Sequence, residues 1–280
     1  MTARRFKPPL NKKFVADRGL YSVYTVDGFA IRNATEADEE FTNFATQNDF
    51  PDLVAEDDIW TTEGTYKREG RFFVANAIAT LESRKAGKSE DDAFDFGNLT
   101  EQRLRERITG IKYRDGRPHK RVPRRVYVRP YFKLPDPEFP IQVWLVDGLM
   151  VRCLYKTDYT EGGHGFVYPW CPKPQIWIDK SIETAEIPYI LAHECIEHRL
   201  MRDKGFEYDR AHEVCAEMEF DLRKAPTRAK FPGLSPRHFH KDRLNALTTP
   251  EFFDYVCHTY IHGTTRIKML VSKIASMAGL

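Results

Sequence analysis

Two segments of this chain are similar to each other, and this repeat limits the folds that the chain can adopt. Residues 21–32 read Y-S-V-Y-T-V-D-G-F-A-I-R, and residues 141–152 read I-Q-V-W-L-V-D-G-L-M-V-R. A strand-like alternation of apolar residues around Asp-Gly is typical of a tight β-hairpin. Since both halves of the chain contain this pattern, we expect two similar structural units.

Further similar segments follow in the same order in each half. Ile59 and Trp60 correspond to Ile176 and Trp177, and V-A-N-A-I-A-T-L-E-S-R corresponds to I-L-A-H-E-C-I-E-H-R-L. The alignment needs small insertions or deletions. We predict an α+β fold of two related small units, each a β-hairpin plus a helix pair, that arose by tandem duplication. A chance resemblance of two hairpins is the alternative.

The predicted domain boundaries follow from this repeat. Residues 1–20 are expected to be a basic N-terminal tail, and residues 21–101 a degenerate first copy without the histidines of the second. Residues 102–140 form a basic connector rich in Arg and Pro, and residues 141–225 form the second copy. Residues 226–280 are a C-terminal extension, which we expect to be helical because its last apolar residues have helical spacing.

Charge is distributed unevenly between these segments. Residues 36–101 contain seventeen acidic and six basic residues, whereas residues 102–133 contain twelve basic and two acidic ones. Basic residues interleaved with aromatic side chains can follow a phosphate backbone and stack on bases, which makes nucleic acid a candidate partner of residues 102–133. The alternative is a solvated connector that offsets the acidic first copy, and charge runs are usually of this kind.

The main functional signal is the segment I-L-A-H-E-C-I-E-H-R-L-M at residues 190–201, an apolar helical run that contains two histidines and two glutamates. Burial of unpartnered charges is costly, so these side chains need a metal ion, a proton relay or an ion-pair network. On a helical wheel, His193 and Glu197 share one face, and Glu194 and His198 lie on the neighbouring stripe. The i, i+4 spacing allows His193 and Glu197 to bind one metal ion.

Two further histidines are candidates for the same site. His212 flanks the apolar stripe of the next predicted helix, near the line where two antiparallel helices would meet. We therefore predict that His193, Glu197 and His212 bind Zn²⁺ or another divalent metal, with a fourth position open. His164 lies between glycines in a loop where the backbone could approach a ligand. Buried hydrogen bonds between histidine and carboxylate, without a metal, are the alternative.

The run H-E-C-I-E resembles the H-E-x-x-H helix of zincin metallopeptidases, in which two histidines bind zinc and the glutamate between them is the general base. This resemblance implies that Glu194 is the general base. The sequence departs from the motif at Glu197, where the zincins have histidine. His198 comes one residue later, about 100° further around the helix, and cannot replace Glu197 in the same geometry.

A wider series of blocks is similar to an uncharacterised group of small bacterial and phage proteins. The blocks are V-D-G-x-x-V-R, G-G-H, I-W-I-D, H-E-x-x-E-x-x-L-M and Y-D-x-A-H, within residues 143–223. This resemblance implies that five residues work as one site without naming a reaction: His164, His193, Glu194, Glu197 and His212.

Two functions from different classes follow. The first is a zinc-dependent hydrolase, in particular a metallopeptidase acting on a peptide or another small substrate, in which Glu194 activates water and His164 binds substrate or stabilises an oxyanion. The second is a non-enzymatic, phage-related structural or nucleic-acid-binding protein with a structural metal or ion-pair site.

Composition excludes some other classes. The hydrophobic fraction of 41% and the mean hydropathy of -0.55 are typical of globular proteins, and no apolar run is long enough to span a membrane. The five cysteines are widely spaced without a C-x-x-C pair, so we expect them to be reduced and the protein to be cytoplasmic. The C-terminal histidines, His238, His240, His258 and His262, are expected to face solvent or a partner, although His258 and His262 are spaced for a second metal pair.

Overall fold

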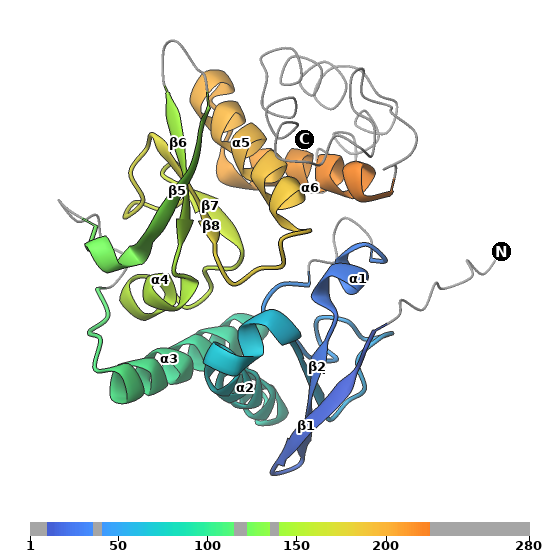
Figure 1. Ribbon diagram of the computed structural model, residues 1–280. Helices are drawn as coiled ribbons and strands as arrows, with labels where there is room; N and C mark the ends of the chain where they lie inside the picture. The colour runs from blue at the N-terminus through green and yellow to red at the C-terminus, as the bar shows by residue number, and fades with distance from the viewer. Residues whose placement is uncertain (1–9, 36–40, 115–121, 135–139, 225–280) are drawn as a thin grey trace. The chain divides into compact units, whose positions relative to one another are not determined.

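The structure is a computed structural model that describes residues 10–35, 41–114, 122–134 and 140–224 (Figure 1). The chain divides into two compact units, Met1–Ile187 and Pro188–Leu280. The predicted C-terminal extension, including its four histidines, lies outside the described residues. None of the helices in the described residues has the length and apolar character that crossing a membrane requires.

The first copy is a four-stranded sheet with one short and two long helices, all inside the first compact unit. Its sheet has the order β1-β2-β4-β3, in which β2 and β4 are parallel and both edge strands are antiparallel to their neighbours. The elements are β1 (Lys13–Arg18), β2 (Tyr21–Val26), α1 (Gly28–Arg32), β3 (Phe44–Ala45), β4 (Asp58–Thr62), α2 (Glu63–Lys85) and α3 (Glu90–Thr109).

The second copy repeats this order. Its sheet has the order β5-β6-β8-β7, and again the two central strands are parallel and the edge strands antiparallel. The elements are η1 (Arg124–Val126), β5 (Tyr127–Leu134), β6 (Ile141–Val146), α4 (Gly148–Leu154), β7 (Gly162–His164), β8 (Gln175–Asp179), α5 (Ile187–Lys204) and α6 (Tyr208–Lys224). The predicted α+β fold with two similar copies is thereby confirmed.

One edge strand of each sheet lies in a segment that the composition indicated as a tail or a connector. Strand β1 begins within the segment predicted as a basic tail, and β5 lies within the segment predicted as a connector, into which α3 also extends. Edge strands carry polar, partly exposed side chains, as the largely exposed residues of β1 do, so their sequences resemble those of linkers.

The two Asp-Gly dipeptides are not hairpin turns, contrary to the expectation from sequence. Each begins a helix: the Asp27 carboxylate caps α1 by accepting a hydrogen bond of 2.9 Å from the Ala30 amide. The turn of the first hairpin instead contains Gly19, whose φ is 64°. The glycines are needed because the end of the parallel strand lies against them: a Cβ on Gly28 would lie 2.6 Å from Thr62, and one on Gly148 would lie 1.7 Å from Asp179.

Each copy has its own apolar core around a tryptophan of its parallel strand pair. Trp60 packs with Val26 and Ile31 in the first copy, and Trp177 packs with Val146 and Val151 in the second. The Ile-Trp pairs that indicated the repeat are therefore core residues at the same place in each sheet.

The two copies exchange buried ion pairs within the first compact unit. Arg32 Nε on α1 donates to Glu186 of the second copy at 2.7 Å, and the corresponding Arg152 Nε on α4 donates to Glu69 of the first copy at 2.8 Å. A second nitrogen of each guanidinium also has a corresponding partner. Arg32 Nη1 donates to the carbonyl oxygen of Phe41, and Arg152 Nη1 donates to that of Tyr159. Reciprocal contacts of this kind are those of an isologous interface between two subunits.

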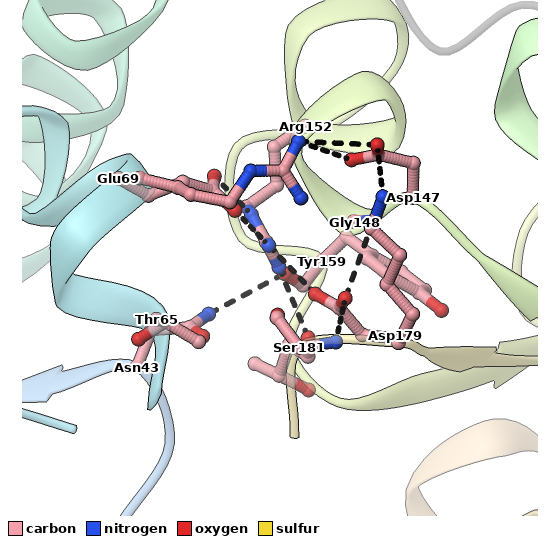
Figure 2. A network of polar contacts seen from close by, with 12 residues as sticks. Asn43, Thr65, Glu69, Asp147, Gly148, Arg152, Tyr159, Asp179 and Ser181 are labelled. Atoms are coloured by element: carbon pink, nitrogen blue, oxygen red, sulfur yellow. Dashed lines mark hydrogen bonds and ion pairs between the residues drawn. The ribbon is translucent and has the colours of Figure 1, made fainter. Parts of the chain in front are cut away.

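Glu69 is the centre of a buried network around the second of these pairs (Figure 2). Its carboxylate contacts Arg152 Nη2 at 2.5 Å and Arg105 Nη1 at 2.7 Å, and Arg152 Nη2 also lies 2.7 Å from Asp179. Asp179 in turn accepts hydrogen bonds from the amides of Gly148 and Ser181. Burial raises the pKa of the Glu69 carboxyl, but the two arginines lower it by more, to about 2.

Replacement of Glu69 by Gln should destabilise the first compact unit. The variant leaves Arg152 and Arg105 buried with too little negative charge, so we expect the free energy of unfolding to fall by about 3 to 5 kcal/mol. Urea unfolding measures this change. Glu63→Gln is the matched control, because its ion pair with Lys13 is exposed and should be worth less than about 1 kcal/mol. Equal effects of the two variants would contradict the role of Glu69.

The contribution of Glu69 should also depend on pH. Its pKa is about 2 in the folded protein against 4.5 in the unfolded chain, so its stabilisation is complete above pH 4.5 and is lost as the pH falls towards 2. The lowered pKa corresponds to about 3 kcal/mol. The difference in unfolding free energy between wild type and Glu69→Gln should therefore shrink over this pH range, and a difference that stays constant down to pH 2 would contradict the assignment.

Candidate metal centre

The candidate residues lie on two consecutive helices, α5 and α6, in the second compact unit. Helix α5 ends at Lys204, and Gly205 follows with φ of 66°, the left-handed conformation that terminates helices. The short connection to Tyr208 makes α5 and α6 neighbours in space. Helix α6 buries Ala211, Cys215 and Met218 along one side, so His212 lies at the border of its buried face.

Three side chains from these helices converge. His193 Nε2 lies 3.1 Å from His212 Nδ1 and 3.6 Å from Glu197 Oε1, and His212 Nδ1 lies 3.1 Å from the same Glu197 oxygen. Zinc holds nitrogen and oxygen ligands at about 2.0 to 2.2 Å, which puts two tetrahedral ligands about 3.4 Å apart. The three donor atoms therefore have the spacing of ligands around one such ion.

His193 has a second contact that fixes its ring. Its Nδ1 lies 2.9 Å from Glu219 Oε2, and Glu219 Oε1 accepts hydrogen bonds from Arg223. Burial raises the pKa of Glu219, but His193 and Arg223 lower it by more, to about 2. Because an ionised carboxylate can only accept, His193 Nδ1 is the donor, and Nε2 is the nitrogen that faces Glu197 and His212.

The surroundings of His193 attract a positive charge. Burial lowers the pKa of His193, but the hydrogen bonds and charges of Glu197 and Glu219 raise it by more, well above its usual range. The same electrostatic field that favours a proton on this imidazole favours a metal cation between His193, Glu197 and His212.

Glu194, the predicted general base, is buried beside this group. One of its carboxylate oxygens lies within 4.8 Å of a Glu197 oxygen, and its Oε2 has no hydrogen-bond partner among the described residues. Burial, and then the charge of Glu197, raise the pKa of Glu194 to about 8. A buried carboxyl oxygen without a hydrogen-bond partner is costly in an ordinary core, whether or not the carboxyl is protonated, which makes Glu194 a candidate for binding something that the described residues do not supply.

His164 lies on strand β7 and not in a flexible loop, as its Gly-rich surroundings indicated. Its backbone pairs with Ile176, and its Nδ1 accepts a hydrogen bond of 3.2 Å from the Phe166 amide. The neighbouring glycine admits an aromatic ring, because a Cβ on Gly163 would lie 2.4 Å from Tyr168. His164 belongs to the first compact unit, so its participation in one site with the helix residues stays a prediction.

His198 contributes no atom to the group formed by His193, Glu197 and His212. It is buried on α5 one residue after Glu197, and therefore on a different side of the helix, as the helical wheel predicted.

Glu219 and Arg223 were not predicted to have a role, although the sequence contains a signal for it. Glu101 and Arg105 have the same i, i+4 spacing on α3, the corresponding helix of the first copy. There Asn76 Nδ2 on α2 donates to Glu101 Oε2 at 2.7 Å, and Arg105 Nε donates to Glu101 Oε1 at 2.8 Å. Asn76 thus occupies the position of His193. Four residues later, Thr80 occupies that of Glu197.

Comparisons of the chain with protein-family models, with curated proteins and with solved structures find no significant match. The residues and the geometry of the candidate centre are therefore the basis for inferring its function.

Replacement of His193 by Asn, the residue at the corresponding position of the first copy, should leave the second unit folded. An Asn side chain can still donate to Glu219, so we expect the free energy of unfolding of the metal-free chain to change by less than about 1 kcal/mol. His193→Leu is the matched variant: it leaves the buried Glu219 without this donor and should cost about 2 kcal/mol more. Thermal or urea unfolding compares them, and equal losses would contradict the correspondence of His193 with Asn76.

Proposed function

We propose that the chain is a metal-dependent hydrolase in which His193, Glu197 and His212 bind one Zn²⁺ ion. The observation that carries this proposal is the spacing of the three donor atoms, 3.1 to 3.6 Å between each pair. Two imidazoles and one carboxylate are a ligand set that catalytic zinc sites use.

The number of ligands favours a catalytic over a structural ion. Structural zinc sites are closed by four protein ligands, usually with cysteine among them, whereas catalytic sites have three and leave one position open. The group of His193, Glu197 and His212 has three members among the residues that the structure describes. The side chain of His212 is 32% exposed, so water and a substrate can approach from its side.

Glu194 would act as the general base of the reaction. It precedes Glu197 by less than one turn of α5, its carboxylate is close to that of Glu197, and its Oε2 is without a hydrogen-bond partner in the described part of the chain. A zinc ion held by His193, Glu197 and His212 would supply Lewis acidity, and its charge would lower the pKa of the nearby Glu194 carboxyl, which could then accept a proton from a water molecule. The substrate class that we propose is an amide or peptide.

A nucleic-acid-binding function of residues 102–133 has less support. Arg105, one of the basic residues of this segment, is buried and pairs with Glu69 and Glu101. Part of the positive charge of the segment is thus used inside the protein and is not available to a phosphate backbone.

The proposal predicts one bound Zn²⁺ per chain, which elemental analysis of the purified protein measures. His193→Ala and His212→Ala should lose the metal, because each removes one of three ligands. Glu194→Gln should retain the metal and lose about 10²- to 10⁴-fold in the rate of peptide hydrolysis, because it removes only the proton acceptor.

Glu213→Gln is the matched control, since Glu213 lies on α6 of the same unit outside the group of candidate ligands. Absence of stoichiometric metal from the wild-type protein would refute the metal centre. Full activity of Glu194→Gln would refute the role of Glu194 and leave the metal centre standing.

A further inference from the structure

We propose that Glu219, held by Arg223, is a positioning residue of the metal centre, which fixes the ring of His193 with Nε2 directed at the metal position. This inference rests on the proposed metal centre and adds a residue pair to it that neither binds the ion nor contacts the substrate.

The two oxygens of Glu219 have separate partners. Oε2 lies 2.9 Å from His193 Nδ1, and Oε1 accepts from Arg223 Nε at 2.9 Å and from Arg223 Nη2 at 2.6 Å. The guanidinium of Arg223 is itself held over the ring of Tyr189, 4.4 Å from the ring centroid. The Glu219 carboxylate is therefore fixed from the side opposite to His193 and cannot turn away from the imidazole.

This arrangement selects one tautomer of the neutral imidazole, which is the form that binds a metal. A carboxylate that pairs with an arginine offers only lone pairs, so the proton of neutral His193 must be on Nδ1. Nε2 then has a free electron pair, and it is this atom that lies 3.1 Å from His212 Nδ1 and 3.6 Å from Glu197 Oε1. A carboxylate behind a metal-binding histidine also makes the imidazole a stronger ligand.

The first copy shows what the same pair does without a metal centre. Glu101 and Arg105 hold Asn76 by equivalent bonds, and Asn76 accepts a further hydrogen bond from Thr80 Oγ1 at 3.2 Å. An amide held in this way has no second nitrogen with a lone pair, so the position cannot bind zinc. The Glu-Arg pair is thus common to both copies, and the second copy places an imidazole where the first has an amide.

The matched pair Glu219→Gln and Glu101→Gln tests this inference in the full-length chain. We expect Glu219→Gln to weaken Zn²⁺ binding about 10- to 100-fold, measured by competition with a chromophoric chelator. It should also change the visible absorption spectrum of the Co²⁺-substituted protein, because the orientation and basicity of one ligand change. Glu101→Gln should leave both properties as in wild type, although it disturbs an equivalent ion pair.

The possible results separate the two proposals. Wild-type affinity and an unchanged Co²⁺ spectrum in Glu219→Gln would overturn this inference and leave the metal centre in place, as would an equal loss of affinity in Glu101→Gln. Absence of metal from the wild-type chain would overturn both. If Glu219→Gln does not fold, Arg223→Lys replaces it: loss of the two-nitrogen contact should weaken Zn²⁺ binding in the same direction, about threefold, and no loss would overturn the inference.

Discussion

Outside the candidate centre, several glutamates lie in the interior of the described part of this protein, and an arginine accompanies them there. A carboxylate that leaves water loses several kcal/mol of hydration, and a hydrogen-bonded guanidinium replaces enough of it to make burial tolerable. Four of these pairs in the described residues fall at matching places in the two copies. Two pairs, Arg32 with Glu186 and Arg152 with Glu69, join the copies. The other two, Glu101 with Arg105 and Glu219 with Arg223, lie on the last described helix of each copy. Two of these pairs thus connect the copies, and one holds the candidate ligand His193.

The two copies differ at the candidate centre, although they share the Glu-Arg pair that supports it. The Glu-Arg pair on α3 holds an amide, and the pair on α6 holds an imidazole, with nearly the same distances in both. Because the supporting residues are present in both copies, three differences separate the two positions: Asn76 against His193, Thr80 against Glu197 and Phe94 against His212. A centre at this position has an orienting carboxylate, whereas one placed on an apolar helix would need to acquire it.

Sequence periodicity was sufficient for the repeat, the fold class and the grouping of His193, Glu197 and His212, because these depend on residues close in sequence or on helical spacing. It failed where the partner is distant. The Asp-Gly dipeptides were read as turns, since the approach of Thr62 to Gly28 and of Asp179 to Gly148 is a tertiary contact. His164 was assigned to a loop because Gly163 suggests flexibility, while its actual neighbour is the ring of Tyr168. Arg32 and Arg152 were recognised as equivalent, but nothing near them in the chain indicates Glu186 and Glu69.

The exchanged arginines also make the two halves of the chain depend on each other. If each half were a separate chain, two identical halves would have to associate, and each assembly would have two identical sites. A covalent link between the halves removes this equality, because residues at matching positions can then change independently. The contacts of Arg32 and Arg152 still require both halves. The half without histidines therefore supplies packing contacts that the other half cannot make alone. A joined chain can therefore carry the group of His193, Glu197 and His212 in one half alone, while the other half still supplies the contacts of Glu69.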